Sequence, residues 1–249
     1  MNVFFLGYTG SMQRQGVPNT SLAVTVDDQT LLVDVSGSPI QALKEAKIDP
    51  KTLRAVLLTH THIDHLYALP SLLHQLWLSG RTLALSIVGN KATIGFAKEL
   101  VELFTLEKKQ HFFPIHWQEI EEGDVTLGKI HMQLFPVNHG VPTLGLSIRW
   151  VNKHLVYLAD TIYTQALPTF LDGADILVHE AGGLKDTEEA LAQKGHSSAR
   201  QAAQCALDLK AKQLILVHLP EDPNEDELLL QEARSLFPAT ELPKLYVPY

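Results

Sequence analysis

Three histidines and one aspartate crowd into residues 60–65, in the stretch Thr59-His60-Thr61-His62-Ile63-Asp64-His65. The stretch follows the apolar run 55–58, so we expect a loop at the end of a buried strand. A single histidine is more often a surface or core residue than a ligand. Four such side chains in one short loop would be costly to bury without a cation, and imidazole and carboxylate groups bind first-row metals. The stretch therefore predicts a metal site at a strand end.

Three more apolar runs end in side chains of the same kind. The runs and the residues that follow them are 155–159 with Asp160, 176–178 with His179-Glu180, and 214–217 with His218. Continuous apolar runs of this length are typical of central strands that are covered on both faces. Open α/β sheets keep their sites at the carboxyl ends of such strands. We therefore expect these residues to gather with residues 60–65 along one rim of the sheet.

The rest of the chain alternates between strand-like and helix-like segments, which is the pattern of an α/β layered fold. A hairpin is expected over 22–34, around the polar turn 27–29. Apolar spacing and stop signals predict helices over 40–48, from about Asp64 through Leu76, over 92–104, from the N-cap Ser197 onward, and over 225–237. No repeat of fixed period or long linker divides the chain. We predict one domain, 1–249, with two similar αβ halves of about 1–125 and 126–249.

Composition excludes some classes of function. The formal net charge is −8, and an acidic chain is poorly suited to holding a long polyanion by charge alone. The one cysteine, Cys205, cannot form an intrachain disulfide and lies in a helix-like segment, so we expect a core residue in a reducing compartment. The first residues lack a basic segment followed by a long apolar run. We expect a cytoplasmic protein that does not enter a membrane.

The pattern His60-x-His62-x-Asp64-His65, with later His139, Asp160 and His218, resembles the metallo-β-lactamase superfamily over nearly the whole chain. The resemblance implies a four-layer αβ/βα sandwich and two divalent metal ions, with zinc as first choice and manganese or iron as alternatives. It also assigns the ligands. The first metal would be held by His60, His62 and His139, the second by Asp64, His65 and His218, and Asp160 would bridge them.

Two further motifs narrow the resemblance to the ribonuclease Z-like phosphodiesterases within this superfamily. Asp175 to Ala181 resembles their His-Glu-Ala-Thr motif, and Gly195 to Ala199 resembles their His-Ser-Thr motif. In that branch the glutamate orients the second histidine, which implies catalytic roles for Glu180 and His196 beside Asp64. Ribonuclease Z carries a long arm for transfer RNA between its third histidine and its bridging aspartate. The short interval from His139 to Asp160 leaves room only for a hairpin.

The first functional hypothesis is a dinuclear metal-dependent hydrolase, a phosphodiesterase that uses a metal-bridging hydroxide on a small phosphodiester. Three alternatives stay open. They are an endoribonuclease of the ribonuclease Z type that processes transfer-RNA 3′ ends, a hydrolase of carbon esters or lactones, and a metal-stabilised binding module without turnover. A homodimer is expected from the resemblance alone.

Asp34, at the end of a strand, matches a residue that supports the ligand loop in the superfamily. That it is a plain turn residue is an equally good interpretation of the sequence.

Overall fold

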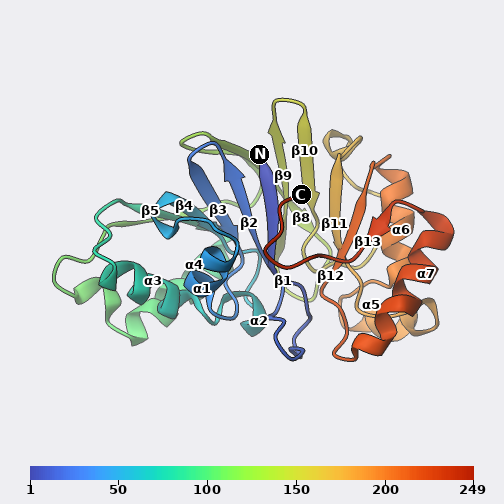
Figure 1. Cartoon of the computed structure of the whole chain (residues 1–249), viewed down its shortest axis with the longest axis horizontal. Helices are drawn as coiled ribbons and strands as arrows, with labels where there is room; N and C mark the ends of the chain where they lie inside the picture. The colour runs from blue at the N-terminus through green and yellow to red at the C-terminus, as the bar shows by residue number, and fades with distance from the viewer.

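Two mixed β-sheets pack face to face in the computed structural model, which describes residues 1–249 (Figure 1). The first sheet has the strand order β1-β2-β3-β4-β5-β6. Its strands are β1 (Asn2–Gly7), β2 (Ser21–Val26), β3 (Gln29–Val33), β4 (Leu53–Leu57), β5 (Leu85–Gly89) and β6 (Ile115–Glu119). The strands β1 to β3 pair antiparallel, and β3 to β6 pair parallel. The parallel part of the sheet therefore brings the carboxyl ends of its strands to one edge.

The second sheet has the strand order β13-β12-β11-β10-β9-β8-β7. Its strands are β7 (Gly123–Leu127), β8 (Ile130–Val137), β9 (Thr143–Trp150), β10 (Lys153–Tyr157), β11 (Ile176–Glu180), β12 (Leu214–Val217) and β13 (Thr240–Glu241). The strands β7 to β10 pair antiparallel, and β10 to β13 pair parallel. The strands that end in candidate ligands are thus shared between two sheets, so the expectation of a single sheet rim is wrong. Both sheets nevertheless end their parallel strands at the same site.

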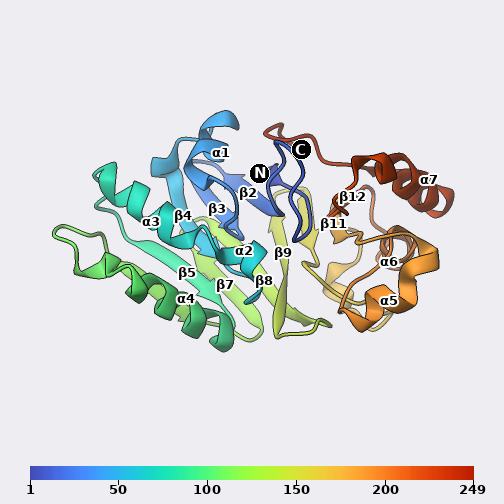
Figure 2. The same cartoon turned by 90° about the horizontal axis from the view of Figure 1, so that it is seen from below.

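Helices cover the outer face of each sheet, as Figure 2 shows from below. The helices are α1 (Pro39–Glu45), α2 (Ile63–Leu66), α3 (Leu69–Leu78), α4 (Lys91–Leu103), α5 (Glu188–Gln193), α6 (Ala199–Asp208) and α7 (Asp226–Leu236). One apolar core lies between the sheets, a second lies under α1, α3 and α4, and a third lies under α6 and α7. Three cores between four layers confirm the predicted αβ/βα sandwich. None of the helices combines the length and apolar character needed to cross a bilayer.

The strand β4 shows why the predicted strands are apolar throughout. Ala55 and Leu57 face the core between the sheets, whereas Val56 and Leu58 face the core under the helices. Because side chains alternate between the two faces of a strand, burial of both faces requires consecutive apolar residues. The apolar run 55–58 is therefore the signature of a strand in a middle layer.

Two helix starts differ from the sequence prediction. The helix expected from Asp64 through Leu76 is two helices, α2 and α3, because the Ala68 amide donates to Val35 and Pro70 has no amide hydrogen. The N-cap of α6 is Ser198 rather than Ser197. The Ser198 hydroxyl accepts from the amide of Gln201, whose side chain accepts in return from the Ser198 amide.

The last five residues cover the free edge of the first sheet. Tyr249 exchanges two backbone hydrogen bonds with Val3 on β1, at 2.9 and 3.2 Å. The Tyr249 ring also meets the edge of the Phe5 ring, with centroids 5.2 Å apart. Unpaired strand edges are templates for association with other chains, so this tail completes the sheet.

Candidate active site

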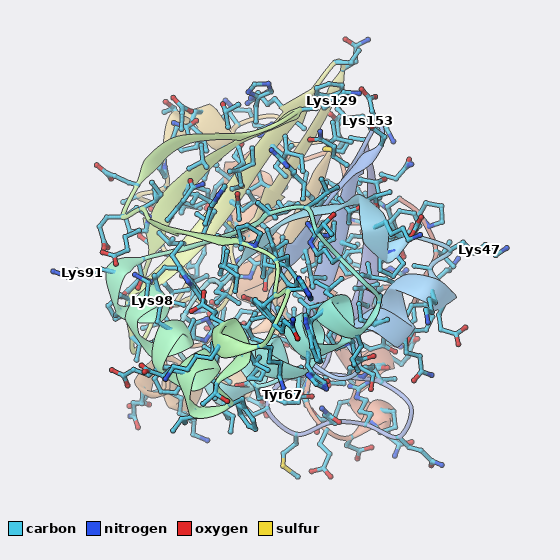
Figure 3. The ribbon with its side chains drawn as sticks, turned by 90° about the vertical axis from the view of Figure 1, so that its left-hand side faces the viewer. Lys47, Tyr67, Lys91, Lys98, Lys129 and Lys153 are labelled. Atoms are coloured by element: carbon cyan, nitrogen blue, oxygen red, sulfur yellow. The ribbon has the colours of Figure 1, made fainter.

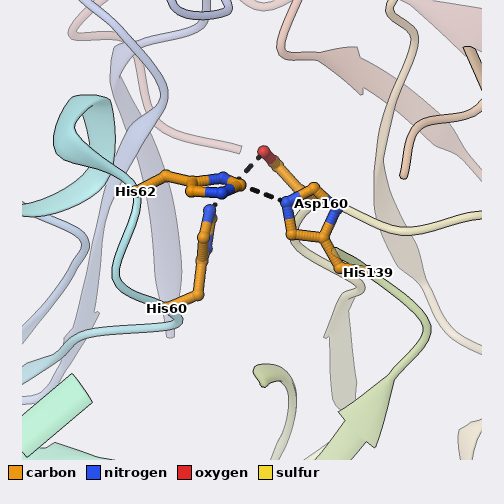
Figure 4. Close-up of side chains that lie close together, drawn as sticks. All are labelled: His60, His62, His139 and Asp160. Atoms are coloured by element: carbon orange, nitrogen blue, oxygen red, sulfur yellow. Dashed lines mark hydrogen bonds and ion pairs between the residues drawn. The ribbon is translucent and has the colours of Figure 1, made fainter. Parts of the chain in front are cut away.

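The polar residues at the strand ends lie together at one end of the two sheets. Possible ligand atoms of His60, His62, His139 and Asp160 lie within 4.8 Å of one another, as Figure 4 illustrates. Those of Asp64, His65 and His218 form a second group with the same spacing. The two groups are the ones that the resemblance assigns to two metals. Their roles as ligands stay a prediction, and this grouping supports it.

Three strand ends have backbone conformations that most side chains avoid. Asp34 after β3, Ala159 after β10 and His218 after β12 have φ angles of 58°, 52° and 52°. A left-handed residue with a β-carbon costs about 1 kcal/mol, and such residues cluster at functional sites where the surroundings hold them. Here the conformation turns the chain sharply at the point where a strand delivers its polar side chain.

Hydrogen bonds determine which ring nitrogen of each buried histidine is free. His65 donates from Nδ1 to Asp34 Oδ2 at 2.7 Å, and His139 donates from Nδ1 to the carbonyl of Gly195 at 2.7 Å. The Thr59 hydroxyl donates to Asp34, so it accepts from His60 Nδ1 at 3.0 Å. In its neutral form each of the three rings therefore presents an unprotonated Nε2 to the site, which is the form that binds a metal.

Several polar atoms at the centre of the site have no hydrogen-bond partner in the protein. They include His60 Nε2, His65 Nε2 and Asp160 Oδ1, which are all fully buried. Asp160 Oδ2 lies 3.8 Å from His60 Nε2, 3.3 Å from His65 Nε2 and 3.2 Å from His218 Nε2. The lone pairs of unprotonated ring nitrogens repel the negative oxygen of a facing carboxylate, unless a cation lies between them. The residues thus fit two divalent cations, with Asp160 at the centre.

The charges around the site favour a bound cation. Burial lowers the pKa of His65, but the Asp160 and Asp34 carboxylates outweigh burial and hold that pKa well above its usual value. Burial raises the pKa of Asp160, but the charges of His218 and His65 hold it well below its usual value. Burial also lowers the pKa of His218, yet Asp160 and the bond to Asp64 raise it to about 8. Asp160 therefore stays ionised and attracts either protons or metal ions.

Glu180 and His196 form a separate pair beside the ligands. Glu180 is fully buried, and both of its oxygens accept from His196 Nδ1, at 3.0 and 3.1 Å. The amide of Thr161 also donates to Glu180, at 2.7 Å. The His196 ring stacks on the His218 ring, with centroids 5.0 Å apart. Burial lowers the pKa of His196, but Glu180 outweighs burial and raises it above its usual value.

Some residues of the site have no signal in the sequence. Thr59 bonds to both Asp34 and His60, and the carbonyl of Gly195 orients His139. Ser11 donates to Asp64 Oδ2 at 3.2 Å from a loop far away in the sequence. Asp34 was equally well explained as a turn residue, and its bonds to Thr59 and His65 favour the supporting role. Of these contacts, the sequence predicted only those of Asp34, through its match to a superfamily motif.

Cys205 and His131 lie outside the site, and so does His179, which the sequence predicted to gather with the other strand-end residues. Cys205 is buried in α6, and burial raises the pKa of its thiol to about 12, so it is not a reactive thiolate. His131 is exposed on β8, where it alternates with the buried Ile130 and Met132. His179 is buried and donates from Nδ1 to the carbonyl of Glu180. None of the three belongs to a group of possible metal ligands.

Comparisons with known proteins agree with this geometry. The Beta-lactamase superfamily domain matches residues 29–219. A ribonuclease Z from Ignicoccus hospitalis is 28% identical over 249 aligned residues, which cover 81% of this chain and 82% of the relative. The metallo-beta-lactamase fold protein YhfI from Bacillus subtilis superposes with a TM-score of 0.84 at 23% identity, covering 100% and 98% of the two chains. A diphosphatase from the PhnP family superposes with a TM-score of 0.77 at 20% identity, covering 100% and 96%.

Proposed function

Since the chain belongs to the Beta-lactamase superfamily and is a metal-dependent hydrolase, we propose that it is a phosphodiesterase acting on small phosphodiesters. The observation that carries this proposal is the pair of Glu180 and His196. A buried carboxylate bonded to one nitrogen of an imidazole holds the ring in one orientation and keeps a proton on it. Such a ring beside a metal pair suits the release of an alkoxide or phenolate from phosphorus.

The proposed metal ligands are the two groups of residues already described. One ion would be held by His60, His62 and His139. The other would be held by Asp64, His65 and His218, and Asp160 would contact both ions. When bound, two divalent ions polarise a phosphoryl oxygen and lower the pKa of a bound water. We propose zinc, because imidazole nitrogens and carboxylate oxygens without any cysteine suit zinc, and manganese or iron would find the same donors.

Two side chains of the site would move protons during the reaction. Asp64 would accept the proton of the attacking water, whose oxygen forms the new bond to phosphorus. His196 would donate the proton on Nε2 to the departing oxygen as the old P–O bond breaks. Its raised pKa supports this role, because a cationic ring keeps Nδ1–H on Glu180 while Nε2–H faces the site. Glu180 would act by orienting that ring.

The surroundings of the site favour a small substrate. The interval from His139 to Asp160 is filled by the hairpin of β9 and β10, so no arm for transfer RNA projects there. No lysine or arginine forms an ion pair with a residue of the site. Figure 3 shows Lys47, Lys91, Lys98, Lys129 and Lys153 spread around one face, apart from Tyr67, which follows the ligand motif. The five lysines labelled in Figure 3 are spaced apart on that side of the molecule and form no continuous basic strip beside Tyr67.

An endoribonuclease of the ribonuclease Z type is the second candidate. The relatives that carry that name favour it, since one of them aligns with most of this chain. The missing arm and the net charge of −8 count against it. The two candidates share the same metal centre, so only the substrate separates them.

A substrate panel tests the proposal. The protein loaded with zinc or with manganese is assayed on bis(4-nitrophenyl) phosphate, cyclic nucleotides, a 3′-extended precursor transfer RNA and lactones. We expect turnover of the small phosphodiesters and none of the lactones. Cleavage of the precursor RNA at the higher kcat/KM would support the second candidate instead. Turnover of lactones alone would refute both, and stoichiometric metal binding without any turnover would indicate a binding module.

A homodimer and a cytoplasmic location stay predictions. Light scattering during gel filtration of the metal-loaded protein measures the mass directly. A mass twice that of the 27.6 kDa chain would support the dimer.

A further inference from the structure

The loop of residues 8–19, which joins β1 to β2, contacts both halves of the metal centre. On one side it pairs with the segment after His218. The Gly10 amide donates to the carbonyl of Leu219 at 2.9 Å, and the Leu219 amide donates to the carbonyl of Tyr8 at 3.0 Å. A β-carbon on Gly10 would lie 3.1 Å from the His218 ring, so glycine permits this close approach. The loop is therefore packed against a proposed ligand of the second metal.

On its other side the same loop contacts the ligand motif of the first half. The Ser11 hydroxyl donates to Asp64 Oδ2 at 3.2 Å. Two residues on, the Gln13 side chain donates to the Tyr67 hydroxyl at 2.8 Å, just after the helix α2 that carries Asp64. Ser11 thus spans the junction between a ligand from α2 and a ligand from the end of β12.

Anchors on both sides hold the loop in place. The Asn19 side chain donates to the carbonyls of Gly10 and Ser11, at 2.6 and 3.2 Å. The Arg14 guanidinium donates to both oxygens of Asp226, at 2.8 and 2.9 Å, and is only 6% exposed. This bidentate pair uses up the charge of Arg14, so that residue is not free to bind a substrate phosphate. Arg14 therefore has a structural role. Together with Asn19 it holds the loop, and this fixes the position of Ser11.

Asp64 needs such a partner more than the other two ligands of its group. Its Oδ2 lies 3.4 Å from His218 Nε2 and 3.5 Å from His65 Nε2. His65 is oriented by the buried Asp34, and His218 is enclosed by the loop. Ser11 is the one residue outside the proposed ligand set that hydrogen-bonds the Asp64 carboxylate. Without that bond the carboxylate can rotate away from the position between the two rings.

We propose that Ser11 is a positioning residue that holds Asp64 for the second metal and so raises the affinity of that metal alone. The inference rests on the two-metal ligand set of the proposed function. A hydrogen bond to a ligating carboxylate limits its rotation and favours the orientation that binds metal. No residue of the loop hydrogen-bonds His60, His62 or His139, the proposed ligands of the first metal, so the affinity of that metal would not respond.

The test measures zinc affinity rather than turnover. Protein stripped with a chelator is titrated with Zn²⁺ against a chromophoric competitor, which resolves the dissociation constants of the two equivalents. In Ser11→Ala we expect one equivalent to weaken about tenfold and the other to keep its affinity. Ser11→Thr keeps the hydroxyl and should restore the affinity of the weakened equivalent. Gln15→Ala is the matched control, because Gln15 is exposed in the same loop and its side chain makes no hydrogen bond.

Each outcome separates the inference from the function on which it rests. Unchanged zinc affinity in Ser11→Ala would refute the positioning role, and so would an equal loss at both equivalents or the same loss in Gln15→Ala. If the unaltered protein binds fewer than two zinc ions, the ligand set itself is wrong. If it binds two and the variant responds as expected, the positioning role stands even where no phosphodiester is cleaved.

Discussion

The position of the proton on each histidine ring determines whether that ring can bind a metal or donate a proton. His60, His65 and His139 each give the proton on Nδ1 to a fixed acceptor, so each offers a lone pair on Nε2. His196, like His65, has its Nδ1 on a carboxylate that raises the pKa of the ring, but it lies outside the proposed ligand set. In the proposed function, histidine thus serves both as a metal ligand and, at His196, as the proton donor.

The proton donor predicts a dependence on the leaving group. Replacing His196 with alanine should lower kcat for diphenyl phosphate by about 10² to 10⁴, because phenolate is a poor leaving group that needs a proton. The loss for bis(4-nitrophenyl) phosphate should be much smaller, since nitrophenolate leaves without one. Steady-state rates on the two substrates measure the difference, with zinc content as the control. Equal losses on both substrates would mean that His196 does not protonate the leaving oxygen.

A histidine far from the metal site predicts how stability changes with pH. His154 on β10 is 3% exposed, and its Nε2 lies 2.9 Å from the Ser147 hydroxyl. Burial lowers its pKa from 6.5 to about 4 in the folded protein. Between these values the unfolded chain binds a proton that the folded chain does not, so the free energy of unfolding falls as pH falls from about 6.5 to about 4.

The variant His154→Gln removes that proton uptake and leaves the metal ligands in place. Between pH 7 and pH 4.5 the unaltered protein should lose about 2 kcal/mol more stability than the variant. Urea unfolding at the two pH values measures both losses. The same loss in both proteins would show that His154 titrates normally in the folded state.

At the level of elements, the tail of residues 245–249 protects β1. Deleting it removes the backbone pairing with Val3 and exposes the edge of the first sheet. We expect a lower melting temperature and association that grows with protein concentration, seen by calorimetry and light scattering. Tyr249→Ala is the control, because it loses the ring contact with Phe5 and the bond from the Lys244 amide to the Tyr249 hydroxyl but keeps the backbone bonds with Val3. Association of the control to the same extent would assign the effect to the ring instead of the edge.

Elements also show how far the sequence can be interpreted. The apolar runs before His60, Asp160 and His218 predicted their strands, because burial on both faces excludes polar residues. The prediction of Ser197 as the cap of α6 was wrong, because the cap is Ser198. Both can cap a helix, and the Ser197 hydroxyl is taken by the carbonyl of Thr161 through a tertiary contact. Local patterns specify elements, and contacts between distant segments adjust their ends.

At the level of the whole molecule, the superfamily motif predicted the layers and the grouping of the ligands. The strand order and the division of strands between two sheets follow from pairing that no local pattern encodes. The contact of Ser11 with Asp64 and the carbonyl that orients His139 are also products of the folded chain. The division into similar halves of about 1–125 and 126–249 stays a prediction.

The proposed metal centre draws residues from both sheets, so bound metal should stabilise the whole fold. His60, His62, Asp64 and His65 follow β4 of the first sheet, whereas His139, Asp160 and His218 follow β8, β10 and β12 of the second. A ligand that binds only the folded state adds stability that grows with its free concentration. We expect removal of metal to lower the melting temperature by several degrees and re-addition of zinc to restore it. A melting temperature that is unaffected by chelation would argue against metal binding between the halves.

Turnover of bis(4-nitrophenyl) phosphate during a zinc titration of the stripped protein is the most direct test of the proposed phosphodiesterase. The stripped protein should be inactive, and activity should rise until two equivalents of zinc are bound and then level off. Asp160→Ala, which removes the carboxylate at the centre of both ligand groups, should stay inactive at any zinc concentration. A protein that binds two zinc ions and cleaves no phosphodiester would contradict the account.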